Sequence, residues 1–107
     1  MVVTQDPELV AKLSKMNAAV MGSTSDPFYG APTVIIVFSD SKMGTCVENG
    51  SLVMGNLMNA AHALGVDSCW IHRAREVFDS EEGKELKKQW GVPEEYYRRG
   101  PLCSWIP

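Results

Sequence analysis

The chain has 107 residues, which suits one domain with a modest core. Its composition, 45% hydrophobic and 21% charged, is typical of a globular protein, and the net charge of −3 gives no electrostatic reason to expect nucleic acid or an anionic membrane as a partner. The apolar runs are too short to span a bilayer, and residues 1–6 lack the pattern of a signal peptide, so we expect a cytoplasmic protein.

The first predicted element is a helix over residues 7–17. Asp6 is a capping residue, Pro7 suits the first helical position, and apolar residues follow at helical spacing. A loop rich in Gly, Ser, Asp and Pro covers residues 22–32. The run TVIIVFS at residues 33–39 is almost continuously apolar and β-branched, which predicts a strand covered on both faces.

The longest predicted helix begins at Asn49 or Gly50 and ends near Leu64. It is apolar or small nearly all round, so we expect it to be buried on most sides, either centrally or against a partner subunit. His62 lies on this helix, where we interpret it as a core or interface residue in preference to a ligand. Gly65 supplies the left-handed residue that ends a helix.

A second strand is predicted at residues 66–71, with Cys69 as a small buried hydrophobic residue. A third helix follows, and Asp79 with Glu82 fits a capping box at its start. Three lysines form what we expect to be its solvent-exposed face: Lys84, Lys87 and Lys88. Two short strands are too few for a stable sheet. An unrecognised strand, a partner chain or a segment outside this chain must therefore complete it.

His72 and Arg73 directly follow the second strand, and strand ends are where ligands tend to lie in α/β folds. A cationic pair there suits a flavin or a phosphate, and a solvated strand end is the alternative. The histidines and cysteines lack the short spacing of metal ligands, so we predict no metal site. The sequence also contains no GxSxG, Walker A or GxGxxG motif, and we assign no catalytic side chain.

Three segments together resemble the nitroreductase family, most closely its shorter bacterial members. They are FYGAPTVIIVFSD, ENGSLVMGNLMNAAHALGVDSCWIHR and FDSEEGKELKKQWGVPEEY. The middle segment is the most specific, because a long helix ending in AAHALG is followed by a strand SCWI. The resemblance covers residues 7–97. It implies an α+β fold, with an antiparallel sheet flanked by helices and a long buried central helix.

The resemblance also implies an FMN-dependent NAD(P)H oxidoreductase. Members are homodimers with FMN between the subunits, and they reduce nitroaromatics, quinones or similar acceptors by ping-pong hydride transfer. By position, Trp70, Ile71, His72 and Arg73 match the family loop that lies against the isoalloxazine ring, most clearly at Ile71 and His72. Some relatives carry an acid and a glycine where this chain has His72 and Arg73, so the donor to the flavin is left open.

The resemblance further predicts one partial domain over residues 1–107. The Arg-rich segment that grips the FMN phosphate in the family would precede residue 1, and a last strand with a basic segment would follow residue 107. Residues 98–107 are atypical: a reading frame shifted by one nucleotide near Tyr97 would restore the family pattern V-G-x-x-x-x-L-G-Y-P. Ordinary divergence is the alternative. A second hypothesis for function is a truncated, non-catalytic dimerising fragment that holds FMN weakly or not at all.

Overall fold

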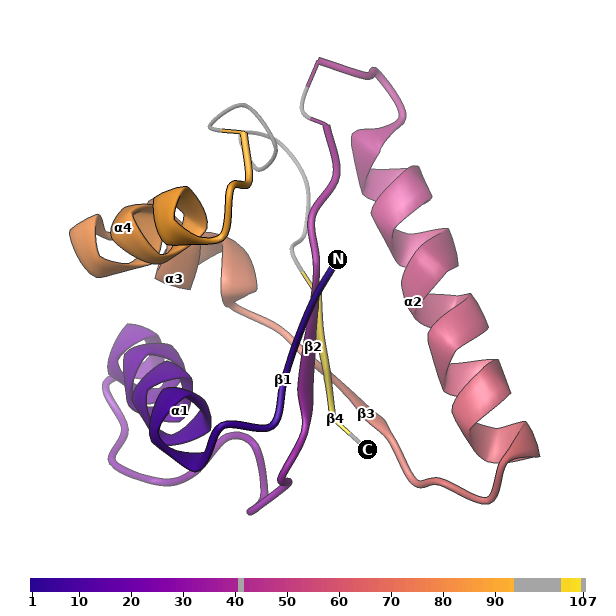
Figure 1. The fold of residues 1–107 in the computed structure, drawn as a ribbon, viewed down its shortest axis with the longest axis horizontal. Coiled ribbons are helices and arrows are strands. Elements are labelled where there is room, and N and C mark those ends of the chain that lie inside the picture. The colour runs from indigo at the N-terminus through magenta and orange to yellow at the C-terminus, as the bar shows by residue number, and fades with distance from the viewer. Residues whose placement is uncertain (41, 94–102, 107) are drawn as a thin grey trace.

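The computed structural model describes residues 1–40, 42–93 and 103–106. Within these ranges the elements are β1 (Val2–Thr4), α1 (Pro7–Met21), β2 (Val34–Val37), α2 (Cys46–Ala63), β3 (Cys69–Ile71), α3 (Ala74–Asp79), α4 (Glu81–Gln89) and β4 (Cys103–Ile106). Figure 1 shows the sheet nearly edge-on, with α2 on one side and α1, α3 and α4 on the other. The chain therefore has an α+β fold with helices on both faces of a small sheet.

The sheet has the strand order β1-β2-β4-β3, and all of its strand pairs are antiparallel. Val3 pairs with Ile35, and Ile36 pairs on the other side of β2 with Ser104. The sequence predicted that two strands would not suffice, and the two ends of the chain supply the others. β4 lies between β2 and β3, within the tail that the sequence marked as atypical. Residues 98–102 and 107 lie outside the described ranges, and the frame-shift hypothesis stays a hypothesis.

The strand β2 is buried on both faces, as its apolar run predicts. Val34 and Ile36 face a core with residues of α1, α3 and α4, whereas Ile35 and Val37 face Met54 of α2. The alternation follows from the pleat, which turns successive side chains to opposite faces. Because β2 contributes side chains to both cores, it connects the packing of α2 on one face of the sheet with that of α1, α3 and α4 on the other.

The predicted helices exist, but their bounds move. Asp6 caps α1 as expected, since its carboxylate accepts the N–H of Glu8 at 3.1 Å, and the helix then runs to Met21. α2 begins earlier than predicted, at Cys46. The third helix is two helices, and the predicted Asp79 cap is wrong. Asp79 ends α3, and the side chain of Ser80 accepts the N–H of Gly83 at the start of α4.

Three predictions about burial are corrected by the tertiary structure. Cys69 is exposed at the start of β3, which is an edge strand of the sheet. Lys87 is only 2% exposed and its ammonium lies 5.7 Å from the ring centroid of Phe38, so it is not on the solvated face of α4. His62 is exposed rather than a core residue. The interface interpretation of His62 stays a prediction.

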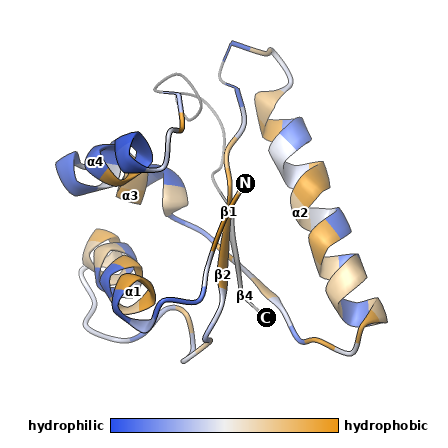
Figure 2. Ribbon diagram, in the orientation of Figure 1, coloured by the Kyte–Doolittle hydropathy of each residue, from blue (hydrophilic) through white to orange (hydrophobic). Residues whose placement is uncertain are grey.

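The long helix α2 was expected to be buried on most sides, but within this chain it buries one face against the sheet, and burial of its other sides against a partner subunit stays a prediction. That face comprises Cys46, Gly50, Met54 and Ala61. Leu52, by contrast, is 68% exposed, and Val47 and Val53 are also exposed. Figure 2 shows hydrophobic colouring along much of the length of α2. The helix therefore presents apolar side chains that this chain does not cover.

Candidate functional site

The four residues matched to the flavin loop form the end of β3 and the turn into α3. Trp70 is half-buried and packs with the core on the α2 side of the sheet, whereas Ile71 is buried in the opposite core. The His72 ring is exposed and stacks on Trp70, with 5.7 Å between ring centroids and 24° between planes. The side chain of Ile71 is thus an anchor in the core, and only its backbone faces the turn.

Arg73 has a left-handed backbone conformation, with φ of 77° and ψ of 4°. For a residue other than glycine this costs roughly 1–3 kcal/mol, so the surroundings must hold it. Glycine adopts the same conformation without strain. The geometry thereby accounts for the glycine that, by the resemblance, some relatives carry at this position.

Asn17 of α1 holds the turn, and the sequence analysis missed it. Its side chain is 2% exposed; Nδ2 donates to the carbonyl oxygen of His72 at 2.9 Å, and Oδ1 accepts from Nε of Arg73 at 2.9 Å. The available signal was periodicity, since Asn17 lies four residues after Leu13 on the apolar stripe of the helix. A polar residue on such a stripe requires a partner. Arg73 is consequently tied to α1 and is not a freely solvated strand end.

Two hydrogen-bond donors of residues 70–73 have no acceptor among the described residues. The indole N–H of Trp70 is buried and has no hydrogen-bond partner among the described residues, which costs roughly 1–3 kcal/mol. No acceptor in the described ranges receives the backbone N–H of Arg73. The edge of an isoalloxazine ring carries acceptors, namely two carbonyl oxygens and ring nitrogens. The donor set of residues 70–73 therefore fits a flavin ring.

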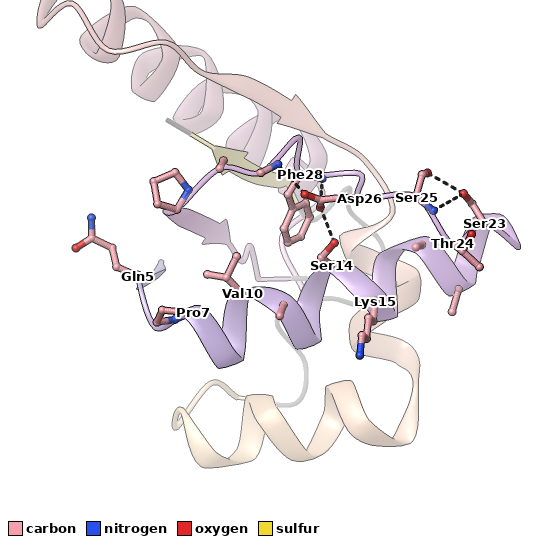
Figure 3. A pocket seen from close by; sticks show the side chains of 16 residues that line it. Gln5, Pro7, Val10, Ser14, Lys15, Ser23, Thr24, Ser25, Asp26 and Phe28 are labelled. Carbon is pink, nitrogen blue, oxygen red and sulfur yellow. Dashed lines mark hydrogen bonds between the residues drawn. The ribbon is translucent and has the colours of Figure 1, made fainter.

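A separate open groove of about 750 Å³ lies between α1 and the loop at residues 23–32 (Figure 3). Asp26 organises that loop, because its carboxylate accepts from Oγ of Ser14 at 2.6 Å and from the N–H groups of Phe28 and Gly30. The hydrogen bond from Ser14, with those from the two backbone N–H groups, holds the pKa of Asp26 below its ordinary value, although burial acts to raise it. The residues that line the groove do not include 70–73. The structure thus does not join this groove to the predicted site.

Within residues 1–40, 42–93 and 103–106, no group of three or more His, Cys, Asp and Glu side chains is placed to hold a metal ion. In the same ranges, no helix has both the length and the apolar character needed to cross a membrane.

The fold of this chain is similar to those of solved nitroreductases. The fold matches a nitroreductase with bound FMN from Desulfitobacterium hafniense, with a TM-score of 0.77 and 23% identity over 98% of this chain and 62% of that one. It also matches two FMN-dependent nitroreductases from Clostridium difficile. Their TM-scores are 0.71 and 0.74 and their identities 24% and 21%, over 98% and 97% of this chain and 59% and 66% of theirs.

The model of the nitroreductase family matches residues 2–100, and the chain belongs to that family. The resemblance and the α+β fold class expected from the sequence are both confirmed. The chain spans about 60% of the length of the first two solved nitroreductases. No curated protein matches this chain significantly.

Proposed function

We propose that this chain is an FMN-dependent NAD(P)H oxidoreductase. It would reduce nitroaromatics, quinones or similar acceptors by ping-pong hydride transfer. The observation that carries the proposal is the segment at residues 70–73, which has two donors without an acceptor in the described ranges and is held by the buried side chain of Asn17, in a chain of the nitroreductase family. FMN, when bound, supplies the hydride-transfer chemistry, and the protein supplies position and environment. The cytoplasmic location and the use of NAD(P)H belong to the same proposal.

Each of the four residues has a distinct role in this proposal. Ile71 fixes the end of β3, because its side chain is buried in the core. Trp70 and His72 form a stacked pair with the imidazole exposed, and this pair would lie beside the flavin ring. Arg73 provides a backbone N–H directed out of the turn. These residues would bind and orient the flavin, and no side-chain nucleophile is required.

The solvent-exposed apolar side chains of α2 support the proposal of a homodimer. Leu52, at 68% exposure, would be covered by a second copy of the chain, which removes apolar surface from water. By the resemblance, FMN in this family lies between subunits, so the dimer also completes the site. A Leu52→Glu variant should be monomeric in sedimentation velocity, whereas Val20→Glu, which changes an exposed apolar residue of α1, should remain dimeric. A wild-type monomer, or loss of the dimer in both variants, would contradict an interface at α2.

The visible absorption spectrum of the purified chain, recorded with and without added FMN, tests the cofactor. We expect flavin bands that stay with the protein through gel filtration, bleach on addition of NADH or NADPH, and return when a nitroaromatic or a quinone is added. The matched variants are Arg73→Pro, which removes the backbone N–H and cannot adopt the positive φ, and Asp79→Ala, which leaves the turn intact. The first should lose FMN and the second should retain it. FMN that stays entirely free with the wild-type chain would refute the proposal.

A second candidate function is a non-catalytic dimerising fragment. The exposed apolar side chains of α2 favour it, since they require only a partner and no cofactor. The two candidates differ in one combined result. A dimer in sedimentation velocity that fails to bind FMN supports the fragment, whereas a dimer that binds and bleaches FMN supports the oxidoreductase.

A further inference from the structure

Asn17 has a buried amide whose two ends both bind the turn between β3 and α3. The residues it contacts, His72 and Arg73, are 55 and 56 positions away in the sequence. Asparagine is a poorer helix former than leucine or alanine, and the interior side of α1 otherwise carries apolar residues. Neither hydrogen bond serves α1 itself. The presence of an asparagine at position 17 is therefore explained by its two hydrogen bonds to the turn.

Because the peptide bond is planar, the hydrogen bond from Asn17 to the carbonyl of His72 also sets the direction of the next N–H group, that of Arg73. The carbonyl of His72 and the N–H of Arg73 belong to one peptide unit, where they point in opposite directions. A hydrogen bond that fixes the carbonyl toward α1 accordingly directs the N–H of Arg73 away from α1. The second bond, from Nε of Arg73 to the same amide, restrains that residue at its positive φ.

We propose that Asn17 is a positioning residue, which fixes the peptide unit between His72 and Arg73 and so directs the donor that this turn presents to the flavin ring. The flavin half of this inference rests on the proposed function. The half that concerns the turn does not, because it describes contacts within the chain alone.

The first measurement is of the backbone order parameters of the turn, by ¹⁵N relaxation of the chain without added FMN. Two variants are compared. Asn17→Leu removes both hydrogen bonds, whereas Asn17→Asp keeps an acceptor for Arg73 and loses the donor to His72. Met16→Ala is the control, since Met16 is the neighbouring half-buried residue of α1 and packs against the core without a bond to the turn. We expect order parameters at His72 and Arg73 to fall from about 0.85 to below ~0.6 in both Asn17 variants and to stay high in the control.

Flavin binding is measured next, by quenching of FMN fluorescence and by the position of the bound absorption bands. Loss of one well-directed hydrogen bond should weaken FMN roughly tenfold in Asn17→Leu and shift the bands. Met16→Ala should change neither the affinity for FMN nor the position of the bands, even where it lowers the thermal stability as much as Asn17→Leu does. Order parameters that stay high in both Asn17 variants would overturn the inference. So would a disordered turn that binds FMN with unchanged affinity and spectrum. A wild-type chain that binds no FMN would refute the proposed function instead, and relaxation would still decide whether Asn17 orders the turn.

Discussion

Gly83 allows α4 to lie directly on α3, and replacing it with alanine should destabilise the fold. It is buried in the first turn of α4, and a Cβ there would lie 2.0 Å from the carbonyl oxygen of Val77 and 2.6 Å from Cα of Phe78. Both neighbours are backbone atoms that cannot rotate away. To reach 3.0 Å, the shortest distance that real Cβ atoms show, the two backbones must separate by about 1 Å, which is 3.0 minus 2.0.

The expected loss combines three terms. Overpacking against backbone costs about 1–3 kcal/mol, because Val77 and Phe78 belong to the core that would have to shift. The shift also disrupts the Ser80 cap, whose loss costs about 1 kcal/mol. The higher helix propensity of alanine returns about 1 kcal/mol. We expect Gly83→Ala to lower the free energy of unfolding by roughly 1–3 kcal/mol and the melting temperature by several degrees.

Gly55→Ala is the matched control, because Gly55 is also within a helix but has nothing within 4 Å of where its Cβ would be. There only the propensity term acts, so stability should rise by up to about 1 kcal/mol. Urea unfolding followed by circular dichroism measures both variants, and sedimentation velocity checks that they are compared in the same oligomeric state. If Gly83→Ala is as stable as Gly55→Ala, the close packing of α3 on α4 is wrong.

Three further predictions concern local features. Asp26 has a pKa below its ordinary value of 3.8, so its ionised form favours the folded state. The wild type should therefore be more stable than Asp26→Asn, by a difference that is largest at pH values well above 3.8. This difference should shrink as the pH falls below 3.8. A difference that does not vary between pH 7 and pH 3 in urea unfolding would contradict this. Ser80→Ala should cost about 1 kcal/mol of unfolding free energy in thermal melts and Asp79→Ala close to nothing, because Ser80 is the cap; the reverse order would restore the prediction made from the sequence. Arg73→Gly and Arg73→Ala both lose the bond to Asn17, but only glycine relieves the positive φ, so the glycine variant should be more stable by roughly 1 kcal/mol or more in the same melts, and equal stabilities would argue against strain.

Local patterns in the sequence were sufficient for the elements that form by local rules. The Asp6 cap and the run at residues 33–39 predicted the start of α1 and the doubly buried β2, because capping and side-chain alternation depend on neighbours in the chain. The flavin loop at residues 70–73 was predicted separately, from the resemblance to the family, and it stays a prediction. Local reasoning chose Asp79 as a cap because it could not detect that the chain turns at Ser80.

Other properties depend on residues far apart in the sequence, and only the tertiary structure decided them. Cys69 is exposed at the start of β3, whose place at the edge of the sheet depends on where β4 inserts. Lys87 is buried on α4, and its ammonium lies near the ring of Phe38, which is distant in the sequence. Asn17 reaches the turn at Arg73 across 56 positions of sequence. The sequence by itself determined the first two helices and the central strand, since these follow from local pattern, and the family followed from the resemblance. The burial of Lys87, the exposure of Cys69 and the partners of Asn17 come from long-range packing, which the local patterns did not specify.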